Sequence, residues 1–336
     1  MAKPAYDRIL DLAIGFWKAR VLLSAVDLGV FTALAAGPLD AAALRRRIGV
    51  HERSARDFFD ALVAEDLLER DSAGRYRNGP EAAHFLDPAQ PTYIGGALAM
   101  FSTRLYGFWG SLTDGLRSGE PQNEAKSGGD LFANIYADPA VLEGFLHAMT
   151  GFSLPVAEAL AHAFPWREVT SVADIGSAEG CLPVQLALAH PHLGAAGFDL
   201  PAVGPLFERY VANHRLSERV RFVAGDFFKD ALPQADVLVM GMILHDWDLP
   251  TKRMLIGKAH AALPAGGSLI ACEMLIDDER RRHLPGLLMS LNMLIETRGG
   301  FDFTAADCAG WMREAGFSAT RTIRLTGAYS AIVGTK

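Results

Sequence analysis

The fold of this chain is decided by the stretch VTSVADIGSAEG, residues 169–180. Its first half is apolar and rich in β-branched residues, which predicts a buried strand ending at Gly176. The apolar residues that follow Gly180 predict a helix. A strand, a tight glycine turn and a helix form the ligand crevice of an open α/β sheet, at the carboxyl end of the first strand. Other strand-to-helix turns share this pattern, but a dinucleotide fingerprint needs glycine where Ala178 and Cys181 stand, so we expect no nicotinamide cofactor.

The composition narrows the class of protein. The chain has 336 residues, of which 50% are hydrophobic and 21% charged, so we expect two domains, or one with a large appendage, and a sizeable core. A net charge of −7 argues against a general nucleic-acid or anionic-membrane binder. We see no signal-peptide pattern and no uninterrupted apolar run near membrane-spanning length, and we expect a cytoplasmic protein. Cys181, Cys272 and Cys308 lack ligand spacing, which predicts neither a metal site nor disulfides.

Residues 1–92 predict a mostly helical domain with a winged helix-turn-helix pattern. Two apolar helices are expected within 8–35, shorter helices begin at Leu39 and Glu52, and a hairpin turns at 71–74. An arginine-rich segment could bind DNA; it contains Arg45, Arg46, Arg47, Arg53 and Arg56. Because the chain is acidic and carboxylates lie nearby, we favour a packing module, and the apolar helices before it favour dimerisation.

Residues 93–165 predict a helical layer that is rich in aromatic side chains and is interrupted by a polar loop at 118–130. Most of these aromatics should fill the core. A helical layer that joins two domains is also where an apolar pocket for a flat substrate would lie.

Strands and helices alternate through the last segment, 166–336. After the first strand, further parallel strands are expected at 195–198, 220–223, 236–244 and 268–272, and a closing hairpin at 320–325 and 329–333. A parallel sheet that is closed by an antiparallel hairpin departs from the nicotinamide pattern and is the arrangement expected of a methyltransferase.

Acidic residues stand where these strands end. Asp174, Asp199 and Asp226 end the first three, and Asp199 lies 23 residues after Gly176, where a carboxylate commonly takes the hydroxyls of a cofactor ribose. The sequence LHDWD at 244–248 follows the fourth strand.

Four segments carry a resemblance to a known family. They are GDFFKDALPQADV (225–237), ILHDWD (243–248), SLNMLIET (290–297) and TGAYSAI (326–332). The chain resembles the S-adenosylmethionine-dependent small-molecule O-methyltransferases, the family of the acetylserotonin and caffeate enzymes, over nearly its whole length. The resemblance implies a Rossmann-like seven-stranded α/β sheet with a C-terminal antiparallel hairpin, preceded by a mostly α winged-helix dimerisation domain. It also implies a homodimer that acts in secondary metabolism.

Methyl transfer to a hydroxyl suggests roles for two residues at the ends of neighbouring strands. A sulfonium methyl is already electrophilic, so the enzyme must align an oxygen nucleophile and remove its proton. A phenol has a pKa of about 10, and histidine titrates near 6.5 and can accept that proton. His245 is placed to do so, and Glu273 can orient the imidazole and stabilise its charged form. The resemblance implies the same roles, and Asp302 is the candidate for the family's second acid, one residue out of step.

The resemblance also assigns the cofactor site. The first glycine loop would take the methionine end of S-adenosylmethionine and Asp199 the ribose, while Asp226 would accept from the adenine amino group beside the ring of Phe227. The full expected set is Asp174, Gly176, Ser177, Glu179, Asp199, Leu200, Asp226, Phe227, Met240 and Trp247. Ser177 and Ala178 replace two glycines of the family's loop.

The acceptor would bind beside the helix around Asn292. Asn292 would hydrogen-bond the acceptor between Met289 and Met293, whose thioethers can clamp an aromatic ring. The expected set is Phe145, Met149, Met289, Asn292, Met293 and Glu296. Met and Phe at helical spacing also suit ordinary core packing, and Glu296 suggests a more polar acceptor than that of the acetylserotonin enzymes.

We therefore expect an enzyme that methylates a hydroxyl of a small aromatic molecule. The identity of the acceptor stays open. Two alternatives remain: the same fold doing N- or C-methylation or cofactor-assisted tailoring without methyl transfer, and a ligand-responsive winged-helix regulator that binds DNA.

Overall fold

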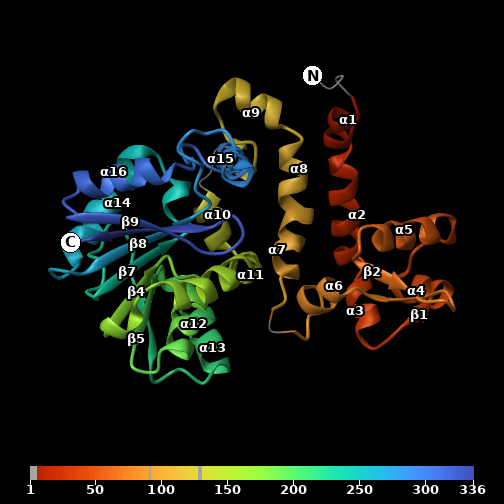
Figure 1. Ribbon diagram of the computed structural model, residues 1–336, viewed down its shortest axis with the longest axis horizontal. Helices are drawn as coiled ribbons and strands as arrows, with labels where there is room; N and C mark the ends of the chain where they lie inside the picture. Colours follow the sequence, from red (N-terminus) through yellow and green to blue (C-terminus); the bar gives the residue numbers. More distant parts are fainter. Residues whose placement is uncertain (1–5, 91, 128–130) are drawn as a thin grey trace, which may run out of the picture. The chain divides into compact units, whose positions relative to one another are not determined.

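The computed structural model describes residues 6–90, 92–127 and 131–336. It divides into two compact units, Met1–Gly107 and Phe108–Lys336 (Figure 1). The division falls inside the helical layer expected at 93–165. The end of the polar loop expected at 118–130, residues 128–130, lies outside the described residues.

The first unit is helical with a small antiparallel sheet. Its elements are α1 Asp7–Ala13, α2 Gly15–Asp27, α3 Val30–Ala35, β1 Leu39–Asp40, α4 Ala41–Ile48, α5 Glu52–Ala64, β2 Leu68–Arg70, β3 Arg75–Asn78, α6 Pro80–Phe85, α7 Gly95–Met100 and η1 Phe101–Leu105. The sheet order is β1-β3-β2, which confirms the hairpin of the expected wing. The two helices expected within 8–35 are in fact three, because Gly29 adopts a left-handed φ of 68° and Ile14 ends α1.

The winged part has its own core and carries arginine–carboxylate pairs. Phe31, Leu44, Phe59 and Leu62 are buried together. Asp60 accepts from Arg70 at 2.7 Å and pairs with Arg56 at 3.7 Å, with neighbouring pairs Arg75–Asp71 and Arg77–Glu69. These pairs agree with a packing role for part of the basic surface.

The second unit is built on a seven-stranded sheet in the order β6-β5-β4-β7-β8-β10-β9. The first five strands of this order are parallel, and β10 and β9 form the expected antiparallel hairpin. Its strands are β4 Ser171–Ile175, β5 Gly194–Asp199, β6 Val220–Ala224, β7 Val237–Gly241, β8 Ser268–Glu273, β9 Ala319–Arg324 and β10 Ser330–Thr335. The predicted Rossmann-like sheet with its C-terminal hairpin is therefore confirmed.

Helices cover both faces of this sheet (Figure 1). Those beside the sheet are α11 Pro139–Ala163, α12 Cys181–Ala189, α13 Gly204–Asn213, α14 Leu249–Ala262 and α16 Ala305–Glu314. The remaining helices and turns are α8 Tyr106–Trp109, α9 Leu112–Ser118, η2 Glu124–Ser127, α10 Leu131–Ala137, η3 Trp166–Glu168, η4 Pro201–Val203, η5 Leu244–Asp246 and α15 Leu284–Glu296. Successive strand residues point to opposite faces, so Val239 packs on the α11–α13 side and Met240 on the α14–α16 side.

One predicted strand is too long. The strand expected at 236–244 ends at Gly241, because Met242 takes a left-handed φ of 55° and turns the chain away from the sheet. Leu244–Asp246 then form a short 3₁₀ turn, η5. His245 is therefore carried by this turn beyond the strand, which lets its side chain face the end of β8 instead of following the pleat.

The helix α11 is long and apolar enough to cross a membrane by length and composition alone, which the sequence analysis did not anticipate. Its two halves contribute Leu142, Leu146, Val156 and Leu160 to the buried core of the second unit. A core helix of a globular protein passes the same test, so length and composition alone do not indicate a membrane span.

Candidate active site

The turn after β4 brings the backbone close to its neighbours. A Cβ on Gly176 (φ 75°) would lie 2.3 Å from Cδ1 of Ile243, and one on Gly180 (φ 90°) would lie 2.5 Å from the ring of Phe207. Both positions therefore require glycine. Ala178 also has a positive φ of 48°, a conformation that costs a residue with a Cβ about 1 kcal/mol or more. The Ala178 amide donates to Oδ2 of Asp199 at 2.9 Å, which ties the strained turn to the end of β5.

Three carboxylates are buried around this turn, on residues Asp174, Glu179 and Asp199. Burial, reinforced by the charge of Asp199, raises the pKa of Asp174 to about 8, and burial raises the pKa of Asp199 to about 6. Asp199 Oδ1 accepts from the Leu200 amide at 2.7 Å and from the Tyr136 hydroxyl at 3.4 Å. The ends of β4 and β5 thus bring together a cluster of buried carboxylates, at the place where the sequence predicts a ligand crevice, and we call this cluster the crevice. Such a cluster favours a cationic ligand.

The helix α11 also contacts this crevice. Oε2 of Glu179 accepts from the Thr150 hydroxyl at 2.7 Å and lies 3.8 Å from Nδ1 of His147. The hydrogen bond between His147 and Glu179 raises the pKa of the His147 imidazole. Ser177 adds a buried hydroxyl oxygen that finds no hydrogen-bond partner among the described residues. A polar ligand in the crevice would satisfy it.

An aromatic cluster lies beside the crevice, built around Trp247. The Trp247 ring centroid lies 5.9 Å from that of Phe227, 4.8 Å from Phe228 and 5.6 Å from Phe132. The indole Nε1 of Trp247 is buried, and no hydrogen-bond partner for it lies in the part of the chain that the structure describes. Asp226, which was expected to bind adenine, pairs with Lys229 at 2.9 Å and accepts from the Phe228 amide, and these contacts lower its pKa.

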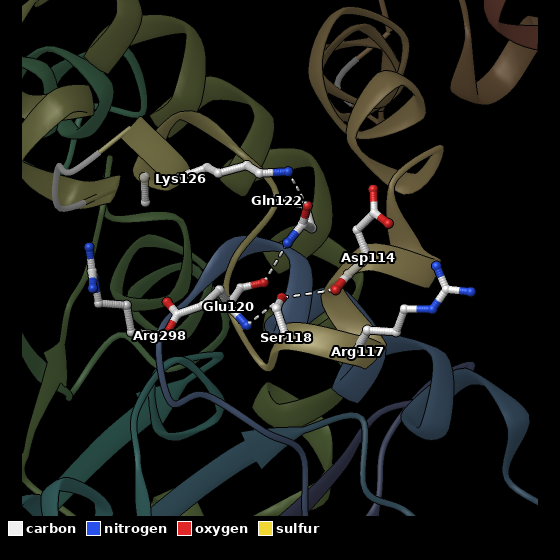
Figure 2. A pocket seen from close by; sticks show the side chains of 8 residues that line it. Asp114, Arg117, Ser118, Glu120, Gln122, Lys126 and Arg298 are labelled. Carbon is white, nitrogen blue, oxygen red and sulfur yellow. Dashed lines mark hydrogen bonds between the residues drawn. The ribbon is translucent and has the colours of Figure 1, made fainter.

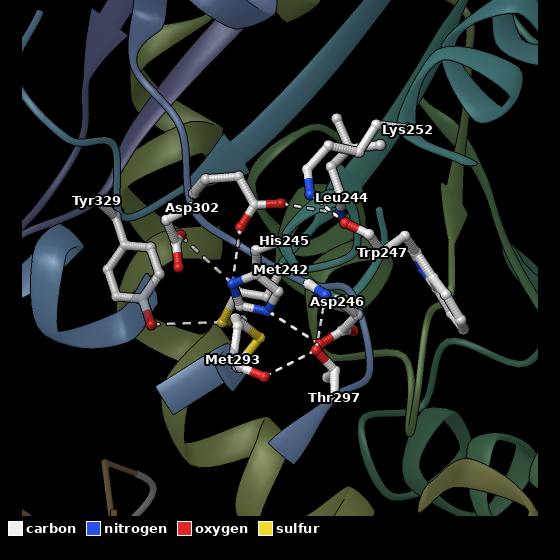
Figure 3. Close-up of polar contacts among 12 residues, drawn as sticks. Met242, Leu244, His245, Asp246, Trp247, Lys252, Met293, Thr297, Asp302 and Tyr329 are labelled. Atoms are coloured by element: carbon white, nitrogen blue, oxygen red, sulfur yellow. Dashed lines mark hydrogen bonds and ion pairs between the residues drawn. The ribbon is translucent and has the colours of Figure 1, made fainter. Parts of the chain in front are cut away.

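The structure brings the three predicted catalytic residues together (Figure 3). Nδ1 of His245 lies 3.3 Å from Oε2 of Glu273 and 3.6 Å from Oδ1 of Asp302, and Nε2 lies 3.5 Å from Oδ1 of Asp246. Oε1 of Glu273 accepts from the Leu244 amide at 3.0 Å, which fixes that carboxylate. Asp302 is 1% exposed, and its assignment as the family's second acid stays a prediction.

Electrostatics in this cluster favour a protonated imidazole. Burial acts to lower the pKa of His245, but the charges of Glu273, Asp246 and Asp302 outweigh it and raise the pKa to about 10. Burial raises the pKa of Glu273 to about 7 and that of Asp246 to about 6. Ligand atoms of His245, Glu273 and Asp302 lie within 4.8 Å of one another, and both carboxylates lie within ion-pairing distance of Nδ1 of His245. No hydrogen bond joins these atoms within the described residues. The cluster can therefore act as a base with two orienting acids, as the sequence predicts.

Sequence reasoning missed a buried cation next to this cluster. Lys252, on the first turn of α14, has no exposed side-chain surface, and its Nζ donates to the carbonyl oxygen of Trp247. The ammonium lies 3.6 Å from the ring centroid of Phe301. Burial lowers the pKa of Lys252 to about 8, although the charges of the nearby carboxylates act to raise it. A lysine in the first turn of a helix looks solvent-exposed in the sequence, so no local pattern could have indicated it.

The predicted acceptor residues fall into two groups. On α15, Met293 and Glu296 are buried and Met289 and Asn292 half-buried, and Oδ1 of Asn292 accepts from Nε1 of Trp109 at 2.8 Å. Trp109 was not predicted, because its partner lies 183 residues away.

On α11, Phe145 and Met149 are half-buried, and Phe145 packs against the core.

The two remaining predicted cofactor residues differ in their burial. Leu200 is half-buried beside Asp199, whereas Met240 is fully buried in the core on the α14 side of the sheet. A hydroxyl of Tyr329 approaches the sulfur of Met242 at 3.4 Å next to His245 (Figure 3).

A separate polar pocket of about 590 Å³ opens beside α9 and the end of α15 (Figure 2). Its lining is Asp114, Arg117, Ser118, Glu120, Gln122, Ala125, Lys126 and Arg298. The adjoining chain is tied to α15, since the Gln122 amide donates to the Ile295 carbonyl at 2.8 Å. The lining contains none of the His245 cluster.

Comparison with known proteins gives consistent matches. A family model described as the O-methyltransferase domain matches residues 109–318, and one described as the O-methyltransferase dimerisation domain matches residues 10–88. The tetracenomycin polyketide synthesis 8-O-methyl transferase TcmO of Streptomyces glaucescens is 43% identical over 98% of this chain and 96% of the relative. The N,N-dimethyltransferase OxyT of Streptomyces rimosus is 40% identical over 80% of this chain and 78% of the relative. The crystal structure of human N-acetylserotonin methyltransferase in complex with S-adenosylmethionine has a TM-score of 0.92 at 28% identity, covering 100% of this chain and 98% of that chain.

Proposed function

Since the chain belongs to the O-methyltransferase family, whose members use S-adenosylmethionine, we propose that it methylates a hydroxyl of a small aromatic molecule of polyketide type, with His245 as general base. The observation that carries this proposal is the position of the His245 imidazole beyond the end of β7, with Nδ1 at 3.3 Å from Oε2 of Glu273 and 3.6 Å from Oδ1 of Asp302. An oriented imidazole with buried acids behind it is the arrangement that proton removal from a hydroxyl requires.

The crevice residues fit the cofactor. S-adenosylmethionine, when bound, supplies an electrophilic methyl group on a positively charged sulfur. The buried carboxylates of Asp174, Glu179 and Asp199 favour such a positively charged ligand. The raised pKa values of Asp174 and Asp199 reflect the cost of burying a negative charge. The unpartnered polar atoms of Ser177 and Trp247 offer further hydrogen-bonding positions. These residues would hold the cofactor.

The protonation of His245 depends on the charge around it. The neighbouring carboxylates stabilise the imidazolium, which is the form that exists after His245 has taken a proton from the acceptor. A neutral imidazole is needed before that step. Positive charge brought into the crevice lowers the pKa of a nearby imidazolium. Filling the acidic crevice therefore favours the neutral, proton-accepting form of His245, and Glu273 and Asp302 then stabilise the charged product.

The acceptor site favours an aromatic molecule with polar substituents. Met289 and Met293 offer thioethers. Asn292 offers an amide group, which is oriented by the hydrogen bond that Nε1 of Trp109 donates to its Oδ1 at 2.8 Å. The similarity to an enzyme of tetracenomycin polyketide synthesis supports a polyketide-type acceptor.

We also propose that the protein is a homodimer. Its first unit matches the family's dimerisation domain, and several large apolar side chains of α1 and α2 are exposed. The exposed fraction is 82% for Leu12, 56% for Phe16 and 59% for Trp17. Exposed apolar surface of this kind marks a protein interaction site.

Methylation of an amine is a second candidate function, favoured by the 40% identity to an N,N-dimethyltransferase. A neutral amine carries its own lone pair and needs a general base less than a phenol does. The mass and fragmentation of the product identify the methylated atom.

The experiment that tests the proposed function compares wild type with His245→Ala, and uses His162→Ala, an exposed histidine of α11, as the matched control. Turnover is measured with methyl-labelled cofactor on a panel of naphthols, anthraquinone phenols and aromatic amines, and binding of S-adenosylhomocysteine by calorimetry. We expect His245→Ala to lose about 1,000-fold in kcat on phenols and to keep its affinity for S-adenosylhomocysteine. Full activity of this variant on phenols would refute the base assignment.

A further inference from the structure

We propose that Lys252 is a positioning residue for the reaction: its buried ammonium fixes the turn that carries His245 against the segment that carries Asp302, and its charge limits how firmly the surrounding carboxylates hold the imidazole proton. This inference rests on the proposed function, because it assumes that His245 is the base.

The side chain of Lys252 folds back instead of reaching solvent. Asp248 caps the N-terminus of helix α14, and its side chain accepts from the Thr251 amide at 2.9 Å. The backbone amide of Lys252 donates to the Asp248 carbonyl at 2.9 Å. From this first turn the Nζ atom returns to the Trp247 carbonyl. Such burial of a lysine is expensive, so its specific contacts call for an explanation.

These contacts join both sides of the catalytic cluster. On one side Nζ holds the carbonyl of Trp247, two residues after His245. On the other it lies 3.6 Å from the ring centroid of Phe301, the residue before Asp302, and 5.7 Å from that of Phe303. A cation over an aromatic face is attracted to it, the more so when desolvated. One ammonium therefore sets the relative positions of the base and its second acid.

The charge of Lys252 also acts on the cluster. The groups that face His245 are Glu273 from β8, Asp302 from the segment after α15 and Asp246 from its own turn. Farther out, the charge of Glu296 on α15 acts on Asp246, and the phenol of Tyr329 lies near Glu273 and Asp302. Lys252 is the cation that α14 adds to this acidic surrounding. Without it the carboxylates would stabilise the imidazolium more strongly, and less enzyme would hold a neutral base near pH 7.

If Lys252 had a purely structural role, its replacement would have a different effect. Apolar residues of similar volume often replace buried charges without loss of stability. If Lys252 only filled space, Lys252→Met would keep both the activity and its pH dependence.

The experiment uses Lys252→Met, which removes the charge and the donor, and Lys252→Gln, which removes the charge and keeps an N–H donor. The matched control is Arg253→Met on the same helix, which removes a cation paired with Glu314 at the surface. Two readouts are taken: kcat against pH, and the ¹⁵N-histidine NMR titration of His245 in the cofactor-free enzyme. We expect both Lys252 variants to raise the pKa of His245 by about one unit and to lower kcat at pH 7 by about tenfold, with recovery at higher pH. Arg253→Met should move neither readout.

A His245 titration that is unchanged in both Lys252 variants would overturn the proposal. Failure of both variants to fold would overturn it as well, because Lys252 would then be a requirement of the fold. The proposed function fails separately: active His245→Ala refutes the base, whereas inactive His245→Ala with an unshifted titration in the Lys252 variants refutes only the role of Lys252.

Discussion

Replacing Glu273 by Gln removes the negative charge beside the imidazole of His245 and changes little else. The amide is isosteric, and its oxygen can still accept from the Leu244 amide, which now donates to Glu273 at 3.0 Å. Two unit charges at the observed 3.3 Å interact by about 5 kcal/mol at an effective dielectric constant of about 20. Asp302 remains 3.6 Å from Nδ1 and retains part of this stabilisation. We therefore expect the pKa of His245 to fall by about two units and the charged imidazole of the transition state to lose about 3 kcal/mol.

The assay is kcat against pH with the best phenol of the panel, together with the NMR titration of His245. Glu273→Gln should lower the plateau of kcat by about 100-fold and move its rising limb to lower pH, because the imidazole then releases its proton more easily. Binding of S-adenosylhomocysteine should be kept, because Glu273 lies outside the crevice formed by β4 and β5. A plateau within about threefold of wild type, or an unmoved limb, would refute the reasoning that this carboxylate stabilises the imidazolium.

Three further predictions follow from the same structure. The pKa of Asp174 is raised to about 8, above its value in the unfolded chain, so between these two values the folded state keeps a proton that the unfolded state has lost. The stability of the cofactor-free enzyme should therefore fall as the pH rises from about 4 to 8. Asp174→Asn should raise the melting temperature at pH 8 and weaken cofactor binding. Trp109→Phe removes the hydrogen bond to Asn292 and should raise KM for the acceptor by about tenfold with a smaller change in kcat; an unchanged KM argues against that contact. Phe16→Asp combined with Trp17→Asp should give a monomer by light scattering, and a persisting dimer would place the interface elsewhere.

The parts of the fold that could be predicted are those that local patterns determine. The apolar run before Gly176, the acidic strand ends and the two final strands around 326–328 indicated the parallel sheet and its hairpin correctly, because burial and turn chemistry are both visible within a few residues. The fourth strand was drawn too long because its apolar pattern continues after Gly241, whereas the backbone turns at Met242 through a conformation that the pattern does not reveal.

The candidate site was predicted only as far as it follows from chain order and family resemblance. The proximity of His245 and Glu273 follows from neighbouring parallel strands, and Asp302 from a motif one residue out of step. The buried cation Lys252 and the indole of Trp109 could not be predicted, because each depends on tertiary contacts that place an ordinary-looking residue beside a distant one. Side chains that serve by folding back or reaching across the sheet leave no periodic signal.

The proposed reaction depends most on one spatial relation, between the imidazole of His245 and the transferable methyl group. A crystal structure of this protein with S-adenosylhomocysteine measures it directly. We predict that the thioether sulfur lies in the crevice at the ends of β4 and β5 and faces Nε2 of His245 across a gap that fits one hydroxyl oxygen and one methyl group, about 5–7 Å. A sulfur that lies elsewhere, or is turned away from His245, would contradict it.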